Sequence, residues 1–308
     1  MKNFAFILSF LLISISITAQ SLPKVISGSI KRHENFYSKF VAARNIDVWL
    51  PDGYTSQKKY NVLYMHDGQM LFDSSATWTH SSWDMDDVVS SLLLADKIQD
   101  VIVVGIWNDG QARHADYFPQ KPFESLSGVQ QDTAYAAVRS NGYSVFGAYK
   151  IHSDNYLKFL VTELKPFIDS TYSTYTQRQH TFIMGSSMGG LISMYAICEY
   201  PSVFGGAACM STHWPGIFTM KNNPIPQAFA KYMQKRLPNP DTHKIYFDYG
   251  DQTLDTLYPP LQKKVDVIIK KKGYDQNNWL SKFFPGQNHS ELSWHSRVDI
   301  PLMFLLKK

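Results

Sequence analysis

Short apolar runs alternate along the chain with stretches whose apolar positions recur at helical spacing. The short runs are rich in β-branched and aromatic residues and predict buried strands over residues 45–51, 60–68, 101–107, 181–185, 204–211, 243–250 and 279–286. The helical pattern covers residues 81–97, 152–172 (interrupted at Pro166), 191–200, 258–273 and 301–308. Alternating strands and helices indicate an α/β fold, with a mostly parallel sheet and helices on both faces.

One stretch breaks this alternation. Residues 108–149 are rich in Gly, Gln, Ser and Tyr and show no clear period. A long irregular segment inside a compact domain is usually functional or mobile, and here we expect it to form a cap or loop insertion over the site. No internal repeat and no low-complexity linker is evident in the sequence, which favours a single catalytic domain over residues 20–308.

The first residues carry a different signal. Lys2 is followed by an apolar stretch over residues 4–17 and then by Ala19, a pattern typical of a secretory signal peptide cleaved after Ala19. The apolar stretch is short for a bilayer span, and the residue after the cleavage point is not a cysteine that could carry a lipid. We therefore expect residues 1–19 to be removed and the mature protein to be exported, periplasmic or secreted, without a stable membrane anchor.

Composition excludes some classes of partner. The formal net charge is only +4, and no dense Lys/Arg cluster alternates with aromatic residues, so nucleic acid is not an expected partner. Cys198 falls on the inner face of an expected helix and Cys209 in an expected strand, so we expect two buried free thiols. A disulfide between them, which export would permit, is the alternative. No residues have the spacing of a zinc site, and we expect neither a metal nor an organic cofactor.

Reactive chemistry is indicated where the strand at 181–185 gives way to a helix. The pentapeptide GSSMG, residues 185–189, matches G-x-S-x-G with Ser187 at its centre, whereas centring on Ser186 puts methionines at both glycine positions. In this motif the nucleophile occupies a strained strand-to-helix turn, where large side chains two residues away would clash. Open α/β sheets bind ligands at the carboxyl ends of their strands, so we predict Ser187 as a nucleophile there.

A serine nucleophile needs a base, which in this fold comes last in the order Ser, acid, His. His243 opens a strand at the wrong end of the sheet, and His295 falls on an expected helix. His289 follows the final strand in a loop, and we predict it as the base. The loop after the preceding strand offers two acids, Asp251 and Asp255, to orient the imidazole.

An oxyanion hole needs backbone N–H donors from two places. One is expected from Met188, the residue after the nucleophile. The other is expected from Gly68 or Gln69, in a loop that stands in the place of an HGGG-type turn. We expect His66 to brace this loop rather than to act as a base.

Six motifs, taken together, resemble one family. They are VLYMHDGQMLFD, VIVVGIWN, ELKPFID, IMGSSMGG, YGDQTLD and GQNHSELSW. They are similar to the esterase branch of the α/β-hydrolase superfamily that includes esterase D, the enterochelin (siderophore) esterases, and the feruloyl and acetyl xylan esterases of carbohydrate esterase family one. The resemblance covers most of the chain after about Asn45 and implies an α/β-hydrolase fold with a serine esterase triad. It implies that Ser187 is the nucleophile and His289 the base. As the triad acid it favours Asp255, which lies 34 residues before His289, over Asp251.

The expected function is an exported serine carboxylesterase that hydrolyses short-acyl or aromatic-acyl esters of carbohydrate or siderophore type through an acyl-enzyme. Two alternatives stay open: an acyltransferase with the same triad, since the branch includes mycolyltransferases, and a non-catalytic binding protein on a hydrolase scaffold. Aromatic and cationic side chains near the expected site are candidates for substrate contacts, with core packing as the alternative for the tryptophans. They are Trp78, Trp83, Trp107, Arg113, Tyr117 and Trp214.

Overall fold

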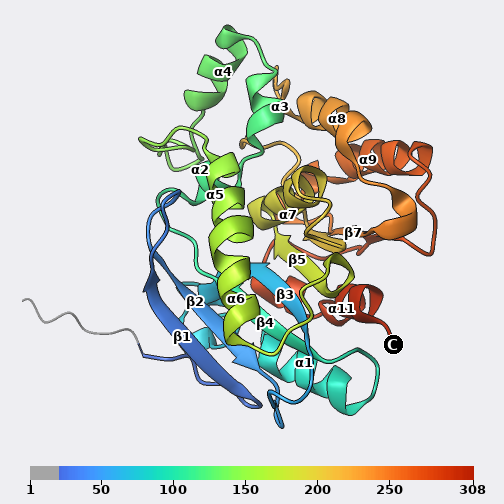
Figure 1. Ribbon diagram of the computed structural model, residues 1–308. Coiled ribbons are helices and arrows are strands. Elements are labelled where there is room, and N and C mark those ends of the chain that lie inside the picture. Colours follow the sequence, from blue (N-terminus) through green and yellow to red (C-terminus); the bar gives the residue numbers. More distant parts are fainter. Residues whose placement is uncertain (1–20) are drawn as a thin grey trace, which may run out of the picture.

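The computed structural model describes residues 21–308, and the predicted signal peptide at residues 1–19 lies outside them. The strands found in these residues are β1 (Ser29–Phe36), β2 (Arg44–Leu50), β3 (Asn61–His66), β4 (Val101–Ile106), β5 (Thr181–Ser186), β6 (Gly206–Met210), β7 (Lys244–Tyr249) and β8 (Trp279–Phe283). They form one sheet in the order β1-β2-β4-β3-β5-β6-β7-β8 (Figure 1). Strands β3 to β8 run parallel, whereas β2 pairs antiparallel with β1 and β4.

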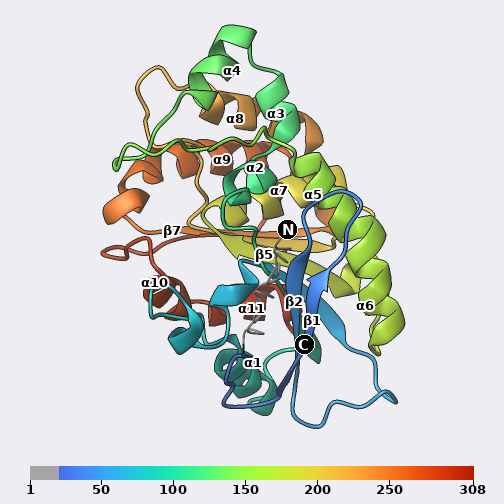
Figure 2. The ribbon, with the colours of Figure 1, turned by 90° about the vertical axis from the view of Figure 1, so that its left-hand side faces the viewer.

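Helices cover both faces of this sheet (Figure 2). Those on one face are α5 (Ser153–Phe159), α6 (Lys165–Thr171), α7 (Met188–Glu199), α8 (Ile225–Arg236) and α9 (Pro259–Lys271). Those on the other are α1 (Met85–Leu94), α10 (Glu291–His295) and α11 (Asp299–Leu306). This is the α/β-hydrolase fold that the sequence predicts. None of the helices within residues 21–308 is long and apolar enough to cross a membrane.

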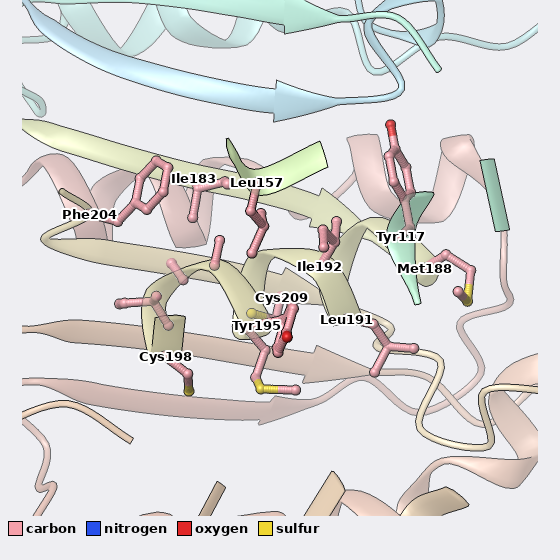
Figure 3. Close-up of a cluster of buried hydrophobic side chains, with 14 of the residues drawn as sticks. Tyr117, Leu157, Ile183, Met188, Leu191, Ile192, Tyr195, Cys198, Phe204 and Cys209 are labelled. Atoms are coloured by element: carbon pink, nitrogen blue, oxygen red, sulfur yellow. The ribbon is translucent and has the colours of Figure 1, made fainter. Parts of the chain in front are cut away.

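Successive side chains of a strand point to opposite faces of the sheet, so the buried side chains form two clusters, one on each face. In β4, Ile102 and Val104 join the cluster under α5 to α9, whereas Val101 and Val103 join the cluster under α1 and α11. All four side chains are buried, as expected for central strands covered on both faces. Figure 3 shows part of the first cluster, between α7 and the strands β5 and β6.

The two cysteines lie in this first cluster. Cys198 comes from α7 and Cys209 from β6, and both are buried and free (Figure 3). Burial raises the pKa of both thiols. Because the thiolate is the reactive form, both cysteines are packing residues, as expected.

Three elements differ from the sequence prediction. The helix expected from residue 81 begins only at Met85, since Asp84 before it has a left-handed φ of 46°. The break expected at Pro166 is instead a π-helical turn, Leu160–Leu164, which joins α5 to α6. Proline clashes with the carbonyl four residues earlier, and a widened turn there lets the helix continue. The segment 108–149 is not irregular throughout, because it contains the short helices α2 (Arg113–Tyr117), α3 (Gln120–Glu124) and α4 (Gly128–Tyr135).

The sequence prediction missed β1 and α8. β1 is an edge strand in which only Ile30 is buried, so it has no apolar alternation to recognise. α8 does carry a helical pattern, because Ile225, Phe229 and Met233 are buried at successive turns. The sequence therefore contained a usable signal for α8 but none for β1.

Candidate active site

Ser187 occupies the turn between β5 and α7, at the carboxyl edge of the sheet. Its backbone has φ 58° and ψ −119°, a strained combination for a residue other than glycine. The Ser187 N–H donates to the Met210 carbonyl at 2.9 Å, and the His213 N–H donates to the Ser187 carbonyl at 3.2 Å. A β-carbon on Gly185 would lie 2.9 Å from the backbone of Gly189. The close approach of these two glycines is what the G-x-S-x-G spacing provides.

His289 and Asp255 meet from two different loops. His289 follows β8, and Asp255 lies in the 3₁₀ turn Thr253–Leu257 after β7. Asp255 Oδ1 is 2.6 Å from His289 Nδ1, and its Oδ2 accepts hydrogen bonds from Ser211 Oγ at 2.7 Å and the Gly250 N–H at 2.8 Å. Burial alone would raise the pKa of Asp255, but hydrogen bonds from His289 and from these groups outweigh it and lower that pKa. The carboxylate is therefore ionised at neutral pH.

Asp251, the other acid in this loop, has hydrogen-bond partners other than His289. Its carboxylate accepts a hydrogen bond from the Gly286 N–H at 2.8 Å. The Gln287 carbonyl accepts hydrogen bonds from the backbone N–H groups of Asp251 and Gln252, both at 3.1 Å. These contacts fix the start of the loop, and the 3₁₀ turn that follows carries Asp255 to the imidazole.

Ser187 and His289 line one cavity of about 320 Å³. Ser187 is 8% exposed, and the His289 side chain is 14% exposed. Trp294 packs edge-on against the His289 ring, with centroids 5.0 Å apart. Met188, the first residue of α7, also lines the cavity, and N–H groups of a first helical turn have no intrahelical acceptor. The cavity therefore suits a reaction in which negative charge develops beside Ser187.

Part of the segment 108–149 forms one wall of this cavity, through Arg113, His114 and Arg139. Arg113 forms a bidentate ion pair with Asp67, with distances of 2.7 Å for Nε–Oδ1 and 2.6 Å for Nη2–Oδ2. Arg139 lies over the Phe218 ring, 4.8 Å from its centroid. Burial is the main cause that lowers the pKa of His114 to about 3. This wall thus combines cations with a neutral imidazole.

The second oxyanion donor expected at Gly68 or Gln69 stays a prediction. Gly68 packs against β4 so closely that a β-carbon would lie 2.5 Å from Gly105. Gly68 and Gln69 line a separate, small hollow. Within residues 21–308, His66, Asp67 and Met70 of this loop line the Ser187 cavity, on either side of Gly68 and Gln69 in the chain.

Three of the expected substrate contacts are corrected, because the residues are not among those of the described chain that line the cavity. Trp107 Nε1 donates to Asp47 at 2.9 Å, and it lines the small hollow beside Gly68. Trp214 Nε1 donates to Gln262 at 2.7 Å in the core. Tyr117 is fully buried in the same core. These side chains pack the fold instead of facing the cavity.

The remaining candidates do line the cavity: Arg113, Trp78 and Trp83. Trp83 stacks on Trp294, with centroids 5.5 Å apart. Trp78 is 65% exposed, so its ring is available at the mouth of the cavity.

The other histidines named from the sequence have partners away from Ser187. His66 Nδ1 is 2.8 Å from the Tyr156 hydroxyl, which fits the expected bracing role. His243 Nε2 is 2.7 Å from the Pro201 carbonyl and lines a larger hollow of about 780 Å³ at the opposite edge of the sheet. Within residues 21–308, no group of three or more His, Cys, Asp or Glu side chains is arranged to hold a metal ion.

Sequence reasoning missed two buried residues beside Ser187. His213 lines the Ser187 cavity, and its Nδ1 is 2.8 Å from the buried Tyr258 hydroxyl. His213 follows the carboxyl end of β6, where the ligand sites of parallel sheets lie, so this rule could have found it. Tyr258 follows β7 by nine residues, and no local pattern marks it.

Comparisons with known proteins point to one family. The model of the family described as "Putative esterase" matches residues 39–300. The uncharacterized protein YbbA of Bacillus subtilis (strain 168) is 22% identical over 269 residues, which are 85% of this chain and 90% of YbbA. An IroE-like serine hydrolase from Shewanella oneidensis has a TM-score of 0.63 at 18% identity, covering 90% of this chain and 79% of that one.

The CE1 ferulic acid esterase of Anaeromyces mucronatus has a TM-score of 0.61 at 20% identity, covering 93% of this chain and 92% of that one. At such low identity, these two structures show a shared fold. The family model, by contrast, matches most of the chain and therefore shows the family. This chain belongs to that esterase family and is a carboxylic ester hydrolase with the α/β-hydrolase fold.

Proposed function

We propose that this esterase is a serine carboxylesterase in which Ser187 is the nucleophile, His289 the base and Asp255 the orienting acid. One observation carries the proposal: Ser187 occupies a strained turn and shares a cavity with His289, whose Nδ1 lies 2.6 Å from Asp255. A carboxylate at Nδ1 keeps the proton there and leaves Nε2 free to take the proton of the serine hydroxyl.

In the proposed reaction, Ser187 Oγ attacks the ester carbonyl while His289 accepts its proton. The negative charge on the carbonyl oxygen is stabilised by the Met188 N–H and by a second N–H, from Gly68 or Gln69. His289 then protonates the leaving alcohol, and the acyl group stays on Ser187. Water, deprotonated by His289, attacks this acyl-enzyme and releases the acid.

We propose esters with short-acyl or aromatic-acyl groups, of carbohydrate or siderophore type, as substrates. A cavity of about 320 Å³ is small, and Trp78 and Trp83 offer rings to a sugar or an aromatic acyl group. The likeness to a ferulic acid esterase supports the aromatic-acyl class. Arg113 and Arg139, both from the segment 108–149, line the cavity, and we propose that this segment acts as its cap.

A series of p-nitrophenyl esters of increasing acyl length, together with methyl ferulate, tests the substrate class. We expect the highest kcat/KM on acetate or on the feruloyl ester, with a steep decline at longer chains. Highest activity on dodecanoyl esters, with none on acetate, would instead indicate a lipid substrate.

The covalent step is tested by mass spectrometry of the intact protein, acid-quenched during turnover. We expect an added acyl mass that is absent from a Ser187→Ala variant. Adding alcohol acceptors separates hydrolysis from acyl transfer: free acid as the main product supports the esterase, and a new ester as the main product supports an acyltransferase.

We also propose export, with a single catalytic domain spanning residues 20–308. The proposal rests on the leader pattern of residues 1–19. Expression of the full chain in a bacterial host, followed by cell fractionation and N-terminal sequencing, tests it. We expect a mature protein outside the cytoplasm that begins at Gln20, and an uncleaved cytoplasmic protein would contradict export.

A further inference from the structure

Ser211 is a buried residue with a strained backbone, next to the proposed triad acid. It directly follows β6, is fully buried, and has a φ of 38°. Residues other than glycine seldom adopt this left-handed conformation. The Ser211 N–H donates to the Asp248 carbonyl at 2.9 Å and to Asp248 Oδ1 at 3.1 Å, which holds the backbone in place. Backbone strain that is maintained in this way is frequent at active sites, so the Ser211 side chain is a candidate for a functional role.

The Ser211 hydroxyl has three hydrogen-bond partners, and their chemistry fixes the direction of each bond. Its Oγ is 2.7 Å from Asp255 Oδ2 and 3.0 Å from both Trp294 Nε1 and Arg297 Nη2. The nitrogens of an indole and of a guanidinium only donate, so Ser211 Oγ accepts from Trp294 and Arg297 with its two lone pairs. Its single proton is left for Asp255, whose ionised carboxylate only accepts. Ser211 is therefore a donor to the triad acid, and this direction does not depend on a histidine tautomer.

Arg297 brings a fixed positive charge to the Ser211 hydroxyl. It lies in the turn between α10 and α11 and is 2% exposed. Its Nη2 is also 3.1 Å from Asp248 Oδ1, and its Nη1 donates to the Ser293 carbonyl at 3.2 Å. The guanidinium lies over the Phe284 ring, 5.0 Å from its centroid. A hydroxyl that accepts from such a cation is polarised and becomes a better donor, so Arg297 strengthens the bond from Ser211 to the acid.

We propose that Ser211 is a positioning residue of the proposed triad, which acts on His289 through Asp255. Its hydroxyl holds Asp255 Oδ2, so that Oδ1 faces His289 Nδ1, and Arg297 and Trp294 hold the hydroxyl in turn. A hydrogen bond to a carboxylate stabilises its ionised form, so Ser211 also draws negative charge away from the oxygen that faces His289. The inference rests on the proposed function and adds to it a residue outside the triad that limits the basicity of His289.

The other charged and titratable groups that face His289 do not bond to Ser211. Tyr258 packs edge-on against the imidazole, with centroids 5.8 Å apart. Within residues 21–308, those that line the Ser187 cavity with His289 are two arginines, two carboxylates and three histidines: Arg113, Arg139, Asp67, Glu291, His66, His114 and His213. In this part of the chain none of them forms a hydrogen bond with Ser211, so loss of its hydroxyl reaches His289 through Asp255.

Ser211→Ala tests the proposal through kinetics and their pH dependence with p-nitrophenyl acetate. We expect kcat to fall about tenfold with KM little changed, because the acid is held at one point fewer. The less stabilised carboxylate attracts the imidazolium more strongly, so the pKa of His289 read from the acid limb of kcat/KM should rise by about half a unit. A wild-type kcat, or a lower kcat without the shift of the acid limb, would overturn the inference.

Ser211→Gly keeps the test informative if Ser211→Ala does not fold. Glycine adopts a φ of 38° without strain but also lacks the hydroxyl, so we expect the same kinetic changes at a different stability. Ser153→Ala is the matched control, because Ser153 is another fully buried serine, whose Oγ accepts from the Gln120 N–H at 3.1 Å and which does not line the cavity. A stable Ser211→Gly protein with wild-type kinetics would contradict the proposal.

A double-mutant cycle tests whether Ser211 acts through Asp255. In an Asp255→Asn background the carboxylate is absent, so we expect Ser211→Ala to change the remaining kcat by less than about twofold. The same tenfold loss in both backgrounds would show that Ser211 acts independently of the acid, and would contradict the inference.

Ser187→Ala separates this inference from the proposed function. If that variant still hydrolyses p-nitrophenyl acetate, the proposed serine mechanism fails. If it is inactive while Ser211→Ala has wild-type kcat and a wild-type pH profile, only the role of Ser211 fails.

Discussion

The Asp255 carboxylate lies 2.6 Å from the Nδ1 atom of His289, 34 residues further along the chain. The same carboxylate is held by Ser211 and by the Gly250 N–H, so its orientation does not depend on the imidazole alone. A β-carbon on Gly250 would lie 2.1 Å from the Gln287 carbonyl. Glycine at this position therefore lets the loop after β7 approach the loop that carries His289.

This pairing predicts a large effect of Asp255→Asn on catalysis. The amide keeps the size of the side chain but stabilises the wrong imidazole tautomer, so we expect kcat to fall by about 10³- to 10⁴-fold. Asp251→Asn is the matched control and should change kcat by less than about tenfold, because Asp251 bonds to Gly286 instead. Steady-state kinetics with circular dichroism checks both variants. Greater sensitivity at Asp251 would reverse the assignment.

The turn at Ser187 predicts that alanine substitutions at Ser187 and at its neighbour Ser186 have very different effects on activity. Ser187→Ala should lower kcat/KM by about 10⁵-fold or more, because the nucleophile is lost. Ser186→Ala should retain most activity, since Ser186 is the last residue of β5. Hydrolysis of p-nitrophenyl acetate measures both. An inactive Ser186→Ala protein with an active Ser187→Ala protein would place the nucleophile one residue earlier.

The contact between Gly185 and Gly189 predicts the effect of an added methyl group. Gly185→Ala places a β-carbon 2.9 Å from the Gly189 backbone, and we expect it to destabilise the fold by about 1–3 kcal/mol and to lower kcat. Gly128→Ala is the control, because a β-carbon there meets nothing within 4 Å and alanine favours helices. Urea unfolding measures both variants, and equal stabilities would contradict the packing argument.

Buried His114 predicts a loss of stability in mild acid. Its pKa is lowered from 6.5 to about 3 in the folded state, mainly by burial. The unfolded chain therefore binds a proton below about pH 6.5 that the folded chain does not, so this residue lowers stability by about 1.4 kcal/mol per pH unit between pH 6 and 3. Its contribution to stability is complete above pH 6.5 and is lost progressively as the pH falls.

A glutamine variant isolates this contribution. His114→Gln can keep a donor to the Gly216 carbonyl, which lies 2.8 Å from His114 Nε2, but it does not titrate. As the pH is lowered from 6 to 3, we expect the free energy of unfolding of this variant to decrease less steeply than that of the wild type. His80→Asn serves as the control, because His80 is exposed and asparagine tolerates its φ of 52°. Identical slopes for wild type and His114→Gln would show that His114 does not contribute.

Much of the fold could be predicted from the sequence. The strands β2 to β8 and the helix α7 followed from apolar periodicity, because burial between two layers requires it. The edge strand β1 could not be predicted in this way, since it buries only Ile30 and its pairing with β2 stabilises it. The π-helical turn before Pro166 also depends on how the helix packs, and no sequence pattern indicated it.

The sequence by itself determined the turn around Ser187 and the order of the proposed triad. The reason is local. Gly185 and Gly189 are four residues apart in the chain and pack against each other. The spacing of the neighbouring apolar residues predicts the change from strand to helix. Chain order likewise places a histidine after the last strand.

Only the tertiary structure decided which acid meets His289 and which side chains line the cavity. Asp251 and Asp255 share one loop, and the choice depends on Gln287, which fixes the start of that loop from beyond β8. Trp107 and Trp214 follow strands as a site residue would, yet each bonds to a partner on another element and turns away from the cavity. Contacts between residues far apart in the chain depend on how whole elements pack together, and no local pattern of residues specifies that packing.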